Sequence, residues 1–190
     1  MTTNKKPMEQ ILEKSQPQAV RIAVDRREKL PYLFNQYPGA TTVLKTLRTG
    51  DYSIAGHEDY IAVERKSLDD FLGSITHGRK RFFRELDRLA QIPYRCIVIA
   101  DMWCAVVDGL WERQVSIESV SGTIQCILQD FQIPVYFLGD RYMAQEFVYR
   151  FLEYRWRRMN DEVPVSRKWL EQAKRREARP VAGSNQETIF

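Results

Sequence analysis

The nearly continuous apolar run from Tyr94 to Ala100 constrains the fold of this chain more than any other segment. Such a run predicts a strand whose two faces are both covered, as in the centre of an α/β sheet. A chain of 190 residues that is 44% hydrophobic can build one sizeable core around such a strand. We therefore expect one α/β domain over residues 20–160, with a mixed central sheet flanked by helices.

The other elements follow from hydrophobic periodicity and turn signals. The predicted strands are 20–24, 42–47, a hairpin formed by 52–54 and 60–66, 94–100 and 133–138. The predicted helices are one that begins at Ser67, 80–91, 115–131 and 141–159. Residues 1–19 are polar and weakly patterned, which predicts an N-terminal tail.

Acidic and basic side chains gather on the predicted hairpin. Glu64 and Lys66 are two residues apart in a strand and therefore leave the same face, whereas Arg65 points to the other face or around its edge. Asp51 and Glu64 lie almost symmetrically about the turn, so we expect them to face each other across the ladder. Two close carboxylates, with backbone and water oxygens, suit Mg²⁺ or Mn²⁺ better than zinc.

This pattern is what metal-dependent cleavage of a phosphodiester requires. A bound metal ion stabilises charge on the phosphate and activates a water molecule, and Lys66 can orient that water. The alternative is that an acid, an arginine and a lysine on an exposed strand form a solvated charged face. The three residues alone do not decide between the two.

A longer match extends this pattern. Gly50-Asp51 is followed by Glu64-Arg65-Lys66-Ser67-Leu68-Asp69-Asp70, and Val24-Asp25-Arg26-Arg27-Glu28 precedes both. These motifs, with similarity at residues 71–75 and 78–79, resemble the nuclease domain of the XPF/ERCC4 family, a branch of the PD-(D/E)XK nucleases. The resemblance covers roughly residues 21–154, with the motifs in the family's order.

The resemblance implies a restriction-endonuclease-like fold and a Mg²⁺- or Mn²⁺-dependent DNA endonuclease. The expected enzyme is selective for DNA structure or single strands and acts in repair or recombination. Asp51 and Glu64 are the expected metal ligands, with Asp25 as an additional or outer acid, Lys66 as the water-positioning residue and Arg65 beside them. One alternative is a catalytically silent DNA-binding or dimerisation subunit, and a more distant one is a junction resolvase or restriction-type enzyme.

Several charged residues have two interpretations each. Arg27 and Arg79 are candidates for contact with phosphate or for structural ion pairs, and Glu28 fits such a network better than a metal site. Asp70 completes a capping box with Ser67, which we favour over metal ligation. The basic cluster that includes Arg79, Lys80 and Arg81 follows the motif directly, so contact with DNA phosphate is favoured there.

Composition adds broader limits. A net charge of +4 and a pI near 9.0 are compatible with a polyanionic partner, and basic residues are concentrated over 161–179, a predicted basic helix. Cys96, Cys104 and Cys126 lack metal-ligand spacing and are predicted to be reduced packing residues. No membrane span or signal peptide is evident, which favours a cytoplasmic protein, associated with the nucleoid if it is bacterial.

The last predicted helix has two apolar stripes. One broad face packs on the sheet, and a second stripe of Tyr142, Tyr149 and Trp156 recurs every seven residues. The second stripe requires either another element of this chain or another subunit. Because nuclease domains of the XPF family dimerise through this region, the resemblance favours a homodimer.

The chain ends in a short peptide after a linker-like segment, both within residues 180–190. Gln186, Ile189 and Phe190 have the spacing of peptides that dock into the bacterial sliding clamp, and the alternative is an accidental apolar end. Longer family members carry a helicase or helix-hairpin-helix module, so this chain is expected to be a stand-alone nuclease domain.

Overall fold

The computed structural model describes residues 19–109, 111 and 115–160. Within them the backbone forms one six-stranded sheet with the strand order β2-β1-β3-β4-β5-β6. The strands are β1 (Val20–Asp25), β2 (Ala40–Lys45), β3 (Tyr52–Ile54), β4 (Ile61–Lys66), β5 (Tyr94–Ile99) and β6 (Val135–Phe137). The sheet therefore ends in a three-residue edge strand, β6.

The sheet is mixed, and its hairpin lies in the middle. Strand β3 pairs antiparallel with both β1 and β4, whereas β1 with β2, β4 with β5 and β5 with β6 are parallel. The carboxyl end of β1, the start of β3 and the end of β4 consequently meet at the same edge of the sheet. Three acidic residues of the motifs, Asp25, Asp51 and Glu64, lie at this edge.

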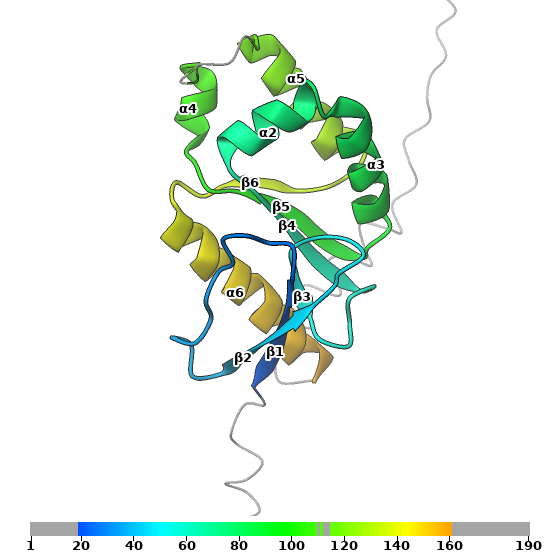
Figure 1. Ribbon diagram of the computed structural model, residues 1–190, viewed down its shortest axis with the longest axis vertical. Helices are drawn as coiled ribbons and strands as arrows, with labels where there is room; N and C mark the ends of the chain where they lie inside the picture. The colour runs from blue at the N-terminus through cyan, green and yellow to red at the C-terminus, as the bar shows by residue number, and fades with distance from the viewer. Residues whose placement is uncertain (1–18, 110, 112–114, 161–190) are drawn as a thin grey trace, which may run out of the picture.

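Helices cover both faces of the sheet (Figure 1). The helices α2 (Leu68–Ile75), α3 (Arg79–Ala90), α4 (Trp103–Val107) and α5 (Ile117–Gln129) lie on one side, and α6 (Arg141–Met159) crosses the other. Alternate side chains of strand β4 pack on the two faces of the sheet. Its Ala62 packs with the α2–α5 side, whereas Ile61 and Val63 pack in the cluster that contains residues of α6.

The expected architecture, a mixed sheet between helices, is confirmed. The bounds of α6 agree with the predicted helix 141–159, and β5 is buried from Cys96 to Ile99, as the apolar run predicts. Helix α4 was not predicted, because five residues are too few to show helical periodicity. Strand β2 begins two residues earlier than expected, at Ala40.

Among the described residues, no helix is both long and apolar enough to cross a membrane. Helix α6 has the length, but charged side chains recur along it. This finding agrees with the absence of an apolar span in the sequence.

Candidate active site

Gly50 sets the backbone geometry of the hairpin at the site. Its φ is +77°, a conformation that L side chains rarely adopt, and a Cβ there would lie 3.0 Å from the carbonyl oxygen of Val63. The next amide, that of Asp51, donates to the same oxygen at 2.8 Å, and the carbonyl oxygen of Asp51 accepts from the amide of Asp25 at 2.9 Å. The main chain of Asp51 is thus held between β1 and β4.

Asp51 and Glu64 lie next to each other on the α2–α3 side of the sheet. Tyr52 pairs with Val63, so the antiparallel register continues to Asp51 and Glu64. Burial, and secondarily the charge of Glu64, raise the pKa of Asp51 to about 8. Burial also raises the pKa of Glu64, although Lys66 opposes that shift. Two carboxyl groups here share a poorly solvated environment.

Lys66 is the nearest described cation to this pair. Its Nζ lies 3.1 Å from Glu64 Oε1 and 5.1 Å from the centre of the Phe82 ring, so its charge is directed at the acids from a mostly buried position. The prediction that Glu64 and Lys66 share one face is therefore confirmed by their contact. One lysine cannot neutralise two carboxylates.

The residues present fit a divalent cation with oxygen ligands. In the described part of the chain, no three His, Cys, Asp or Glu side chains are grouped closely enough to hold a metal ion. Two half-buried carboxyl groups with raised pKa values would nevertheless gain from an added cation, because it offsets their mutual repulsion. A set of few carboxylates completed by water is what Mg²⁺ uses, whereas zinc needs nitrogen or sulfur ligands that are absent from this pair.

Asp25 is the last residue of β1, and both of its carboxylate oxygens accept hydrogen bonds. Its Oδ1 accepts from the backbone and Nε of Arg27 at 2.7 and 2.9 Å, and its Oδ2 accepts from Arg27 Nη2 and the Leu47 amide, both at 2.8 Å. The Arg27 side chain is the main reason that the pKa of Asp25 is lowered. These four bonds favour the supporting role over direct ligation, and the same contacts make Arg27 part of a structural ion pair.

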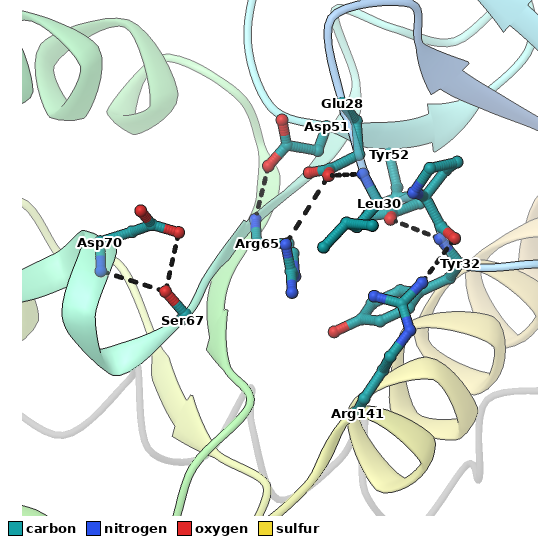
Figure 2. Close-up of polar contacts among 10 residues, drawn as sticks. Glu28, Leu30, Tyr32, Asp51, Tyr52, Arg65, Ser67, Asp70 and Arg141 are labelled. Carbon is teal, nitrogen blue, oxygen red and sulfur yellow. Dashed lines mark hydrogen bonds and ion pairs between the residues drawn. The ribbon is translucent and has the colours of Figure 1, made fainter.

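Arg65 leaves β4 on the opposite face from Glu64 and Lys66, because side chains alternate along a strand, and Figure 2 shows it beside Glu28. Its backbone amide donates to Asp51 Oδ2 at 2.8 Å, but its Nη1 lies 3.6 Å from Glu28 Oε1 on the other side of the sheet. Its guanidinium also lies 5.8 Å from the centre of the Tyr32 ring. Glu28 therefore belongs to an ion-pair network, as expected.

Asp70 caps the helix that follows the motif. The Ser67 hydroxyl donates to Asp70 Oδ2 at 2.7 Å and accepts from the Asp70 amide at 3.1 Å (Figure 2). The predicted cap is confirmed, and it fixes the start of α2 directly after Lys66. The carboxylate bonds the hydroxyl here, whereas the usual capping box bonds the backbone amide of the cap residue.

The basic residues predicted to contact DNA occupy the first turn of α3. Arg79, Lys80 and Arg81 are exposed there, and that turn holds no acidic residue. Arg79 lies 4.5 Å from the centre of the Phe83 ring, and Arg81 pairs with Glu85 at 3.2 Å. Positive side chains at the positive end of a helix are unfavourable without an anion nearby. Their contact with phosphate stays a prediction.

The predicted second stripe of α6 needs a correction. Tyr149 is 4% exposed and stacks on Tyr37 with ring centres 3.8 Å apart, so it belongs to the core of this chain. Trp156 is partly buried beside His57, at 6.2 Å between ring centres, and only Tyr142 is well exposed. For Tyr149 the partner is therefore another element of this chain, the loop before β2, and not a second subunit. The homodimer itself stays a prediction.

Other predictions meet the structure unevenly. The three cysteines are free, as expected, but Cys104 is exposed and the expectation that it packs in the core was wrong. The predicted basic helix at 161–179 and the clamp peptide of Gln186, Ile189 and Phe190 lie outside the described residues. The sequence interpretation missed the contact of both Arg65 and Arg141 with the Tyr32 ring, because Tyr32 and Arg141 are more than a hundred positions apart and share no pattern.

Three comparisons place the chain among known proteins. The ERCC4 domain family matches residues 24–151. A Saccharolobus solfataricus protein named 3′-flap repair endonuclease Xpf is 29% identical over 139 residues, covering 70% of this chain and 55% of that protein. A Methanocaldococcus jannaschii protein described as an ATP-dependent RNA helicase is 34% identical over 119 residues, covering 62% of this chain and 13% of that protein.

Solved structures give the same result for the fold. XPF from Aeropyrum pernix superimposes with a TM-score of 0.61 at 23% identity, over 77% of this chain and 66% of that one. The same protein in complex with DNA gives 0.55 at 21% identity, over 81% and 74%. The chain spans about half the length of the Saccharolobus solfataricus protein and about an eighth of the length of the Methanocaldococcus jannaschii protein. With the family's motif residues assembled around one strand end, this chain belongs to the ERCC4 domain family.

Proposed function

We propose that this chain is a divalent-metal-dependent DNA endonuclease, selective for DNA structure or single strands and acting in repair or recombination. The observation that carries the proposal is the half-buried pair Asp51 and Glu64, both with raised pKa values, and the contact of Lys66 with Glu64. Membership of the ERCC4 domain family supports it, as do the names of the relatives, a 3′-flap repair endonuclease and an XPF structure bound to DNA.

Asp51 and Glu64 would hold Mg²⁺ or Mn²⁺. When bound, such an ion polarises the phosphate and lowers the pKa of a coordinated water. Asp51 is held in place by the Arg65 amide, which donates to its Oδ2 at 2.8 Å. Asp25 supports the site by fixing the end of β1 and the residue after β2 through Arg27 and Leu47.

Lys66 would hold the attacking water or stabilise the developing charge. Its ammonium group contacts Glu64, and the Phe82 ring beneath it limits its access to bulk water. The ammonium group next to Glu64 would contribute electrostatic stabilisation of the transition state. The exposed basic turn of α3 lies on the same side of the sheet and would receive the DNA backbone.

The decisive experiment is cleavage of labelled single strands, flaps, bubbles and junctions with and without Mg²⁺ or Mn²⁺. Asp51→Asn and Glu64→Gln should each reduce the rate at least about a thousandfold, because losing one ligand costs several kcal/mol of transition-state stabilisation. DNA binding measured without metal should survive in both variants.

Matched control variants are Asp59→Asn and Glu118→Gln, which remove the same charges from exposed positions on the β3–β4 turn and on α5. They should cleave at the wild-type rate. Undiminished cleavage in EDTA, or in Asp51→Asn, would refute the proposal. Binding without cleavage of any substrate would favour the alternative, a catalytically silent DNA-binding subunit.

A further inference from the structure

We propose that a surface beside the carboxylate pair binds an unpaired strand of the substrate. We call it the loop surface, and it consists of Lys29, Leu30 and Leu33 from the β1–β2 loop and Arg141 and Tyr142 from the start of α6. The proposal rests on the proposed function, since it names a substrate feature for the same site.

The loop surface exposes large apolar side chains. Leu30 and Leu33 are 64% and 63% exposed, and Tyr142 is 69% exposed. The two neighbouring aromatic residues of the loop, Tyr32 and Phe34, are instead buried. The loop is therefore anchored by its aromatic residues while it presents its leucines outward. Such exposed apolar side chains around a rigid anchor are typical of a binding surface.

Arg141 fastens the loop to helix α6. Its Nη2 donates to the carbonyl oxygen of Pro31 at 2.6 Å, and its guanidinium lies 4.9 Å from the centre of the Tyr32 ring (Figure 2). On the sheet side, the Tyr32 ring stacks on Tyr52 at 5.2 Å between centres, and the Tyr32 amide donates to the Tyr52 hydroxyl oxygen at 2.8 Å. Both parts of the loop surface are thus held in one arrangement.

A short chain of contacts links this surface to the carboxylate pair. Glu28 Oε1 accepts from the Leu30 amide at 2.8 Å and lies 3.6 Å from Arg65 Nη1. The backbone amide of Arg65 then donates to Asp51 Oδ2 at 2.8 Å. Figure 2 shows Leu30, Glu28 and Asp51 around Arg65. The loop surface and the carboxylate pair therefore lie at the same end of β4, on its two faces, so a strand on the loop surface would reach the pair around this edge of the sheet.

The charge of the loop suits a polyanion. Its exposed charged residues, Arg26, Arg27 and Lys29, are all basic, while its one carboxylate, Glu28, is turned inward to Arg65. The acid nearest to Arg141 in sequence, Asp140, caps α6 by accepting from the Met143 amide at 2.8 Å. Basic groups interleaved with exposed apolar and aromatic side chains bind single strands, because unstacked bases can lie on them. The bases of a duplex are already stacked and cannot use these side chains.

The first test compares binding of fluorescent oligothymidine and of a duplex of equal length, by anisotropy in EDTA. The double variant Leu30→Ser/Tyr142→Ala should weaken single-strand binding at least about tenfold, as expected for lost stacking contacts, with duplex binding nearly unchanged. The matched control Leu128→Ser/Tyr154→Ala removes the same residue types from exposed positions on α5 and α6, and should bind both as the wild type does.

The second test separates phosphate contact by Arg141 from its role in fastening the loop. Arg141→Gln should reduce the slope of log K against log salt for the single strand by about 0.7, the value for one lost phosphate contact, and Arg141→Lys should restore it. An unchanged slope would refute the phosphate contact.

These experiments need no cleavage, so a failure of the proposed function would not be mistaken for a failure of this inference. Thermal denaturation establishes that each variant is folded. Equal losses on both DNA forms, or no loss on the single strand, would overturn the proposal. A lower molar mass of the double variant by light scattering would also overturn it, because the surface would then join two copies of this chain.

Discussion

The two faces of strand β4 differ in how far apart in the sequence their contacting residues lie. On one face, Glu64 and Lys66 meet Asp51 across a hairpin, so the sequence distance between partners is short. On the other face, Arg65 meets Glu28 and Tyr32 from the β1–β2 loop, and Arg141 from a helix far along the chain contacts the same Tyr32 ring. Consecutive residues of one motif therefore belong to two different groups. Glu64 and Lys66 contact residues nearby in the sequence, whereas the contacts of Arg65 form only when distant segments pack together.

The largest effect should come from removing the cation on the acid face. Lys66→Met is expected to lower turnover at least about a hundredfold, because the charge that stabilises the transition state is lost. Thermal stability should change little, because burial raises the pKa of the neighbouring Glu64 carboxyl and so favours its neutral form once the lysine is gone. Rapid cleavage by Lys66→Met would remove lysine from the mechanism. Loss of folding would make its contact with Glu64 structural.

The same face should show a distinctive pH dependence of stability without metal. The pKa of Asp51 is raised to about 8 in the folded protein, so the folded state keeps a proton that the unfolded state releases above about pH 4. Stability should therefore fall as pH rises from about 4 to 8. Asp51→Asn should reduce this fall and be more stable than the wild type at pH 9 by about 2 kcal/mol or more. Added Mg²⁺ should also stabilise the wild type there. Parallel denaturation profiles for the two proteins would contradict the prediction.

Asp25 should behave in the opposite sense, although it lies at the same strand ends. Its pKa is lowered by Arg27, so its contribution is present above the unfolded-state pKa and is lost as pH falls through the lower folded-state pKa. Asp25→Asn should cost about 2–3 kcal/mol at pH 7, because a buried hydrogen-bonded charge is replaced. The difference from the wild type should shrink in acid. Urea denaturation at several pH values measures both quantities, and a difference that does not depend on pH would refute this assignment.

The smallest effect should come from the cap that follows the motif. Ser67→Ala removes the bonds to Asp70 and should cost about 1 kcal/mol of stability. Ser67→Thr keeps the hydroxyl and should lose much less. If cleavage by Ser67→Ala falls much more than stability at a temperature where the protein is folded, the cap also positions Lys66.

Local features of the sequence were enough to predict the acid face. The alternation along β4 separates Glu64 from Arg65, and the turn composition at residues 55–59 indicates the hairpin that brings Asp51 to Glu64. The Ser67 cap follows from spacing as well. None of these inferences needs information about distant contacts.

The other face depends on packing that no short pattern encodes. The periodicity of α6 predicts that Tyr149 needs a partner, but it does not reveal that Tyr37 of the same chain covers it. Arg141 was read as an ordinary helix start, since its contacts with Pro31 and Tyr32 arise only after α6 packs near the β1–β2 loop. Helix α4 was missed because it is one short turn-like element between two longer ones.

The short edge strand β6 affects how readily copies of this protein aggregate at high concentration. An edge strand exposes unpaired backbone groups that can recruit a strand from another molecule and start aggregation. Strand β6 has only three residues, Val135–Phe137, and aromatic side chains flank it, with Trp103 against Phe137 and Phe147 against Tyr136. Few backbone groups are therefore available for sheet extension at this edge, and association between copies along β6 would depend on side chains.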